Sequence, residues 1–384
     1  MTIKKKGYIL FILAIKNFYN HKTLDKIQYI LEESRNMNKK ISIEKFNSLL
    51  NILSNDYKIM APKAFENEGR YSYDDDIRYG EIKKFEEIIF DKKSNASPKE
   101  IILPIVHTLA VQVDDRIVPT MEINDDEKDI LVFVHPCDIH GITRLDNTFK
   151  DDTFYQVRRR KIKFVMIECE KNGWDSCFCV SLNTNVSDNY SLALVIKNNE
   201  ILLECKDKSL EKYFENLEDI EKFQFKFIQK NKIEISIPKL ETWDKMALDR
   251  IKTSKIWDEF SDRCIGCGSC NMACMTCTCM NTTIVSSENN QNIKIKKRIW
   301  SGCQLVRSKS LEKESLSKIV PKRIRQRVLD KFYRPKLKES KEQICVGCGR
   351  CTDACPKHIN FAATINKFNK ELDKIYIEFG RCEE

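Results

Sequence analysis

The sequence of 384 residues is poor in histidine and glycine, and both shortages narrow the chemistry available to it. Its five histidines are scattered; only His135 and His140 lie close together, and we interpret both as structural residues or as donors to ligand side chains. None of the 11 glycines forms a G-x-G-x-x-G motif after a strand-like run, which argues against FAD or NAD bound at a Rossmann turn. We therefore predict no catalytic residue in this chain.

Long apolar runs are also missing. The longest, residues 8–15, is too short to span a bilayer, and no small-residue cleavage site follows it as in a signal peptide. We therefore expect a cytoplasmic chain with no membrane span. Residues 1–40 are predicted to be an N-terminal extension. Because Met37 has the form of a natural start, our hypothesis is that residues 1–36 arise from the choice of start codon, which the N-terminal sequence of the native protein tests.

Cysteine, in contrast, is abundant, with 17 in the chain. Thiols of a cytosolic protein stay reduced, so this number indicates metal ligands rather than a disulfide framework. The segment CIGCGSCNMAC at 264–274 recurs as CVGCGRCTDAC at 345–355, followed by Pro356. The repeated spacing is that of a protein with two [4Fe-4S] clusters, which predicts a role in electron transfer.

In the usual crossed pattern, one short loop supplies three thiolates to a cluster and the last cysteine of the other loop supplies the fourth. We therefore assign one cluster to Cys264, Cys267, Cys270 and Cys355, and the other to Cys345, Cys348, Cys351 and Cys274. The two glycines within each loop are expected to adopt positive φ and to let backbone amides approach the cluster. Zinc is the alternative, but a tetrahedral zinc site does not need a third cysteine at the same interval in both copies.

A basic block lies between the two motifs. Residues 294–338 contain sixteen Lys or Arg against three acids, a local balance of +13 in a chain of net charge +9. A cubane with four thiolates is an anion, so nearby cations stabilise it, and a surplus can attract an acidic partner. Nucleic acid is the rival explanation, but no helix-turn-helix, finger or aromatic stacking motif accompanies the block. A solvated basic helix face is the plainest interpretation.

Apolar periodicity predicts the elements. Residues 41–56 and 79–91 have helical spacing, and strands are predicted at 101–109, 129–135, 162–169, 191–197, 200–205 and 223–237. After Pro238 no strand pattern is evident, and helices are predicted at 361–376 and at 311–332, where Pro321 interrupts the pattern. The fold class is therefore α+β, with a mixed α/β domain at 41–240 followed by an α-helical dicluster ferredoxin domain at 241–384.

A second group of cysteines lies near the ends of predicted strands in the mixed domain: Cys137, Cys169, Cys177 and Cys179. Buried apolar thiols are the alternative, because a free cysteine behaves as a small hydrophobe. Cys177 and Cys179, however, are separated by one residue and follow Asp175 and Ser176, a loop setting in which thiols ligate or react. We interpret the group as a candidate third [4Fe-4S] site, in which Asp138 is a candidate to replace one thiolate.

The chain resembles the iron–sulfur electron-transfer subunits of the anaerobic sulfite reductases and, more distantly, the iron–sulfur beta subunits of sulfhydrogenases. The likeness covers nearly everything after residue 40 and is carried by MAPK at 60–63, PCDIHG at 136–141, LD at 145–146, CFC at 177–179, both cluster motifs, CTC at 277–279 and WSGC at 300–303. His135 stands where relatives often have Arg and Met275 where they have Pro, and residues 305–316 replace a stretch with two glycines. None of these departures removes a ligand of the two motifs.

The resemblance implies an electron-transfer subunit that itself carries no sulfite chemistry. Its expected partners are a flavin/NAD-binding subunit, which holds FAD and a pyridine nucleotide, and a sirohaem subunit, which reduces sulfite to sulfide. The alternative in the same redox class is the beta subunit of a nickel–iron sulfhydrogenase, and an iron–sulfur nucleic-acid-binding protein is the alternative from another class. Cys277, Cys279 and Cys303 match the family motifs but receive no role from spacing alone, and two roles stay open for them: packing thiols near the clusters or alternate ligands.

Overall fold

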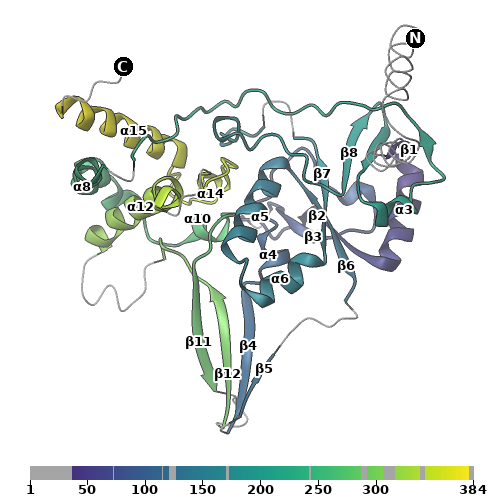
Figure 1. Cartoon of the computed structure of the whole chain (residues 1–384), viewed down its shortest axis with the longest axis horizontal. Coiled ribbons are helices and arrows are strands. Elements are labelled where there is room, and N and C mark those ends of the chain that lie inside the picture. Colours follow the sequence, from purple (N-terminus) through teal and green to yellow (C-terminus); the bar gives the residue numbers. More distant parts are fainter. Residues whose placement is uncertain are drawn as a thin grey trace, which may run out of the picture.

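The computed structural model describes residues 37–379, except for 72, 115, 121–126, 170–172, 242–243, 287–291, 306–315 and 338–341. The hypothesis about residues 1–36 lies outside this range. A large sheet with helices on both faces stands beside a helical part, and a narrow four-stranded sheet projects from the body (Figure 1). Within the described residues, no helix is long and apolar enough to cross a membrane.

The large sheet has eight strands in the order β10-β1-β9-β8-β7-β6-β2-β3. Its central strands β2, β6, β7 and β8 are parallel to one another. Each strand outside this group, β3 on one side and β9, β1 and β10 on the other, pairs antiparallel with its neighbour. In chain order the strands are β1 (Met37–Ser42), β2 (Tyr57–Phe65), β3 (Asp76–Glu81), β6 (Asp129–Val134), β7 (Ile162–Ile167), β8 (Leu192–Lys197), β9 (Glu200–Cys205) and β10 (Glu218–Asp219). The sheet thus begins at Met37, before the expected domain boundary at residue 41.

Helices cover both faces of this sheet. On one face α3 (Ile43–Asp56), capped by the Ser42 side chain, buries Phe46, Leu49, Leu50 and Leu53 against the strands. Each such side chain contributes about 1.5–3 kcal/mol by leaving water. On the other face α5 (Pro136–Thr148) and α6 (Thr153–Arg160) pack on the sheet. Short helices at the connections are η1 (Phe85–Glu87), α4 (Lys99–Ile102), η2 (Val180–Leu182) and α7 (Lys208–Glu211).

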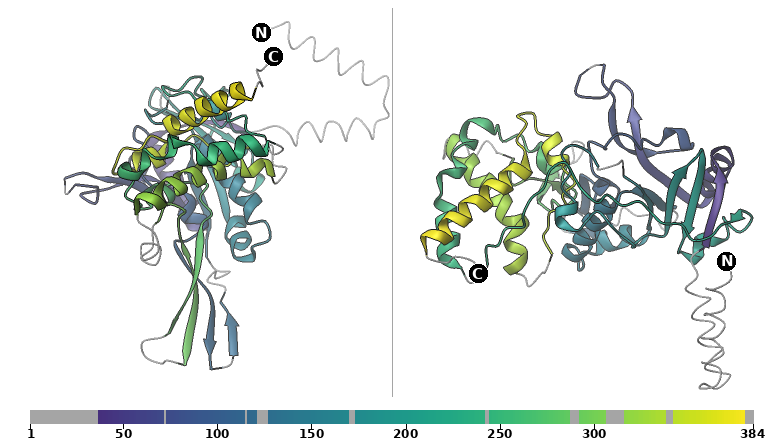
Figure 2. Two further views of the ribbon diagram at one scale, coloured as in Figure 1. Left: turned by 90° about the vertical axis from the view of Figure 1, so that its left-hand side faces the viewer. Right: turned by 90° about the horizontal axis from the view of Figure 1, so that it is seen from above.

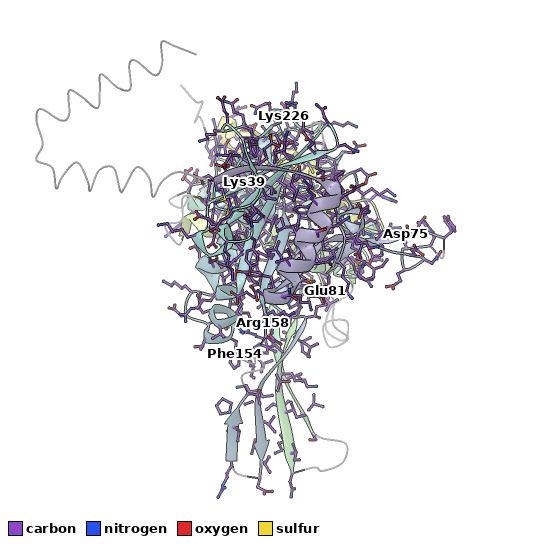
Figure 3. The ribbon with its side chains drawn as sticks, turned by 90° about the vertical axis from the view of Figure 1, so that its right-hand side faces the viewer. Lys39, Asp75, Glu81, Phe154, Arg158 and Lys226 are labelled. Atoms are coloured by element: carbon purple, nitrogen blue, oxygen red, sulfur yellow. The ribbon has the colours of Figure 1, made fainter. Side chains whose placement is uncertain are left out.

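The projecting arm is a four-stranded antiparallel sheet in the order β11-β12-β4-β5. It joins β4 (Val106–Val113) and β5 (Arg116–Pro119) to a hairpin of β11 (Met280–Ser286) and β12 (Ile293–Trp300) from the second half of the chain. At its root Arg298 pairs with Asp152, and the His107 ring packs edge-on against Phe154 at 4.6 Å between centroids. Figure 3 labels Phe154 at this junction, where the arm leaves the body.

The helical part has its own apolar core. It is built from α8 (Lys245–Thr253), η3 (Lys255–Trp257), α12 (Leu316–Phe332) and α15 (Phe361–Glu378). Phe178 and Leu182, from the connection between β7 and β8, also lie in this core, so the two parts share a packed boundary. Figure 2 shows them side by side when seen from above.

The predicted fold class is confirmed, because the chain combines a domain built on a mixed sheet with a second, mainly helical domain that carries the cluster motifs. Several element predictions were wrong. The predicted helix at 79–91 is β3 followed by η1, because Ile82, Phe85 and Ile88 reach the core from a turn and not from a helix. The predicted strand at 101–109 is α4 followed by β4. The predicted break at Pro321 is absent, since α12 continues through it.

The alternating stretch at 223–237 is extended but forms no strand. Side chains take the place of a neighbouring strand: the Lys226 amide donates to Glu168 Oε1 at 2.7 Å and the Ile235 amide to Ser181 Oγ at 3.1 Å. The prediction of no strand after residue 241 was also wrong, because β11 and β12 form the arm. In β12 isoleucines alternate with lysines. The lysines count toward the basic block and hide the strand pattern in the sequence.

Candidate metal centre

The two cluster motifs fold into nearly identical loops. In each, the two glycines have φ between 66° and 77°, as predicted: Gly266, Gly268, Gly347 and Gly349. A short helix begins directly after the second glycine, α10 (Ser269–Met272) in the first copy and α14 (Arg350–Asp353) in the second. Positive φ next to helical backbone turns successive amides toward one side, which suits an anionic cluster.

The cysteines of the first predicted set lie around one cavity. Its wall contains Cys264, Cys267 and Cys270 from the first loop and Cys355 from the second, and Cys351, which is assigned to the second set, also reaches it. The backbone amide of Ile359 donates to Cys355 Sγ at 3.3 Å. The structure thus brings the crossed cysteine to the three local ones, as a cubane site requires.

The second predicted set is buried deeper. Cys274 lies close enough to Cys345 and Cys351 to affect the pKa of both thiols. Burial raises the pKa of Cys345 and of Cys351 to about 12, so cluster binding must displace protons from both. Among the described residues, no three His, Cys, Asp or Glu side chains surround a single-ion position. A cubane places its thiolates further apart than one ion does, because irons and sulfides lie between them.

Part of the basic block points toward the cysteines. Arg327 of α12, of which only 4% is exposed, donates to Cys270 Sγ at 3.2 Å and to the Cys270 carbonyl at 3.1 Å. Lys331, one turn later, donates to the carbonyl of Thr276 at 2.8 Å. Cations placed here would offset the negative charge of a bound cluster, which remains the prediction for this part of the basic block.

The third predicted set gathers at the carboxyl ends of two parallel strands. Cys137 lies in the first turn of α5, directly after β6, and Cys169 follows β7. Cys177 and Cys179 come from the same connection after β7 and are both 4% exposed. Loops after neighbouring parallel strands meet at one sheet edge, which explains why these thiols converge. Burial raises the pKa of Cys179 to about 12.

This third set borders the second cluster motif. Cys137 and Cys179 pack with Cys348, and the amide of Phe178 donates to the carbonyl of Gly347 at 2.8 Å. A Cβ atom at Gly347 would lie 2.6 Å from the Cys179 nitrogen, so the approach requires glycine there. Cys348, assigned to the second set, is therefore packed directly against thiols of the third set.

The structure gives Asp138 a role other than the predicted iron ligand. Its two carboxylate oxygens accept from Arg350, Nη1 to Oδ1 at 2.5 Å and Nη2 to Oδ2 at 3.0 Å. The pair is almost fully buried, with side chains 0% and 2% exposed. Lys93 adds a second link between the domains, donating to Ser176 Oγ at 2.6 Å and to the Cys348 carbonyl at 3.0 Å.

The sequence prediction missed Arg350, although a signal was present. The residue directly before the third cysteine of the motif is Ser269 in the first copy and Arg350 in the second. Within a loop whose cysteines and glycines match in both copies, a long cation in place of a small side chain indicates a residue with its own partner. Here that partner is Asp138, and the pair fastens the second loop to α5, the helix that carries Cys137.

Comparison with known proteins supports these centres. Residues 263–359 match the 4Fe-4S dicluster domain family. This segment holds two [4Fe-4S] clusters, so the prediction of two clusters is confirmed. The chain is also 25% identical over 332 residues to the beta subunit of sulfhydrogenase 2 from Pyrococcus furiosus, a match that covers 79% of this chain and 92% of the relative. No solved structure matches the chain.

The chain is an iron–sulfur electron-transfer protein. Its relation to a sulfhydrogenase beta subunit agrees with the more distant of the two resemblances drawn from the sequence. The family match identifies the dicluster segment, and the similarity to the relative indicates the general class of the chain.

Proposed function

We propose that this chain is the electron-transfer subunit of an anaerobic sulfite reductase complex. In this role it carries single electrons from a partner subunit that binds FAD and NADH to a partner subunit whose sirohaem reduces sulfite to sulfide. The observation that supports a relay most strongly is the succession of thiol groups, in which the first set, the second set and the third set adjoin one another. Neighbouring centres within one protein form a path for electrons.

The proposal assigns the ligands in the crossed pattern. Cys264, Cys267, Cys270 and Cys355 hold one cluster, and Cys345, Cys348, Cys351 and Cys274 hold the other. The clusters supply one-electron redox chemistry when bound. The residues of the chain hold them, exclude water by burial, and place Arg327 against Cys270 Sγ, where a positive charge favours the reduced, more negative state.

The third site is part of the proposal. Cys137, Cys169, Cys177 and Cys179 hold a [4Fe-4S] cluster beside the second motif, while Asp138 neutralises Arg350. Three buried thiols and the partly buried Cys169 at one sheet edge are more than packing requires. Cys169 Sγ also lies 3.4 Å from His135 Nδ1, a nitrogen able to orient a ligand.

Removing one thiol tests the third site. We expect Cys179→Ala to lower the iron content of the anaerobically purified chain by about four atoms, and to remove one component of its low-temperature EPR spectrum. Cys205→Ala is the matched control, because Cys205 is 1% exposed in β9 within the apolar core of the large sheet. An equal iron content in the two variants would show that these four thiols serve only for packing.

A second candidate function follows from the relative found above, the beta subunit of a sulfhydrogenase. In that case the same relay serves a nickel–iron hydrogenase, and the chain's own residues act in the same way. The structure of this chain alone supports both partners equally, so the partner enzyme has to be identified by its reaction.

Isolation of the complex from the native cells through a tag on this chain separates the two functions. We expect the co-purified material to oxidise NADH with sulfite as the acceptor and to contain sirohaem. Hydrogen-dependent reduction of a viologen dye without sulfite reduction would identify the hydrogenase instead. The control is the Cys355→Ala chain in the same cells. Partners that bind it but no longer exchange electrons show that the activity passes through this chain.

A further inference from the structure

Three cysteines outside the predicted sets lie together at the root of the arm. Cys277 and Cys279 precede β11, and Cys303 follows β12, so the hairpin brings its two ends to one place. The Ser301 amide donates to the Cys279 carbonyl at 2.8 Å, which fixes the two sides. The thiol of Cys279 contacts the thiols of both Cys277 and Cys303.

Buried amide groups face these sulfur atoms. Asn271 Nδ2 donates to Cys277 Sγ and to Cys303 Sγ, each at 3.4 Å, and Gln304 Nε2 donates to Cys303 Sγ at 3.4 Å. Asn271 and Gln304 are 3% and 2% exposed. Hydrogen bonds from buried donors to sulfur are a feature of cluster ligands, because they stabilise thiolate charge. Thiols that serve only for packing have no need of them.

The three cysteines line a cavity of about 300 Å³. Its wall also carries positive side chains, Arg144, Arg327, Lys331 and Arg334. A cavity lined by sulfur and by cations is suited to an anionic group larger than a single ion. Cys274, assigned to the second cluster, lies on the same wall, so the cavity adjoins that cluster.

We propose that Cys277, Cys279 and Cys303 bind a further iron–sulfur cluster, held by three thiolates. It extends the relay from the second cluster to the root of the arm, where Cys279 and Cys303 are only partly buried. The inference goes beyond the proposed function and does not depend on which partner enzyme is served. Zinc is the alternative occupant of a group of thiols, and the metal that the variants lose distinguishes the two.

Metal analysis of variants tests the site. We expect Cys279→Ala and Cys303→Ala each to lower the iron content of the full chain by about three or four atoms with matching sulfide, and the double variant to lose no more than either. Cys205→Ala, in the core of the large sheet, keeps the full content. Unchanged iron, or the loss of one zinc, would overturn the proposal. Neither variant touches the third site, so its result stands apart from that of Cys179→Ala.

Labelling of the unaltered protein gives a second test that does not rely on variant folding. Under anaerobic conditions, we expect iodoacetamide to modify Cys279 and Cys303 only after the clusters have been removed by an oxidant and a chelator. Peptide mass spectrometry measures the modification at each cysteine. Because both side chains are partly exposed, modification in the native protein would show free thiols and contradict the proposal.

Discussion

Replacing Arg350 by methionine is expected to destabilise the protein by about 3–5 kcal/mol, because it leaves the Asp138 carboxylate buried without its partner. The guanidinium occupies both carboxylate oxygens, and neither side chain has more than 2% of its surface exposed. We expect the midpoint of thermal unfolding, followed by circular dichroism under anaerobic conditions, to fall by about 10 °C. Wild type and variant are compared at equal iron content, since bound clusters also stabilise the fold.

Two controls separate the buried charge from the general cost of a substitution. The double variant Arg350→Met/Asp138→Asn is expected to regain part of the loss, because no unpaired charge remains. Lys367→Met removes one partner of an exposed ion pair with Glu259, and we expect it to cost less than about 1 kcal/mol. A midpoint for Arg350→Met equal to that of Lys367→Met would show that the buried pair does not hold the two parts together.

Replacing Cys355 by alanine is expected to remove the cluster of the first motif, although Cys355 belongs to the second. Its thiol lies on the cavity wall with Cys264, Cys267 and Cys270. We therefore expect the Cys355→Ala chain to lose about four irons and to show the same EPR spectrum as Cys264→Ala.

Cys345→Ala provides the contrast in this experiment. If each motif held its own cluster without exchange, Cys355→Ala would share the spectrum of Cys345→Ala. An iron content that stays at the wild-type level in Cys355→Ala would mean that this cysteine is no ligand at all.

The sequence predicted the parts of the fold that depend on local pattern. The runs at 129–135, 162–169 and 200–205 became β6, β7 and β9, because strands made mostly of apolar residues are stable only in the interior. The sequence prediction failed where the neighbouring segment in the fold determines whether a stretch forms a strand. Residues 223–237 alternate like a strand but meet side chains in place of a sheet edge, whereas β12 lies between two partners, β11 and β4.

The candidate site divides in the same way. Ligand spacing and positive-φ glycines are local properties, and the structure places the cysteines of the first motif and Cys355 around one cavity. The partner of Asp138 was not predictable, because Arg350 is far away in the chain and reaches the carboxylate only when the two parts pack together. The grouping of Cys277, Cys279 and Cys303 likewise depends on the hairpin of β11 and β12. This hairpin was not predicted, because the lysines of β12 obscure its apolar pattern.

The pairing of β4 with β12 also has a consequence for the order of synthesis. During translation β4 emerges long before β12, and until then one edge of β4 presents free amides and carbonyls, with Val106 and Val113 exposed beside them. An open edge of this kind invites pairing with other chains. The nascent protein therefore passes through a stage that favours aggregation, and the stage ends only when residues 293–300 have left the ribosome and closed the arm.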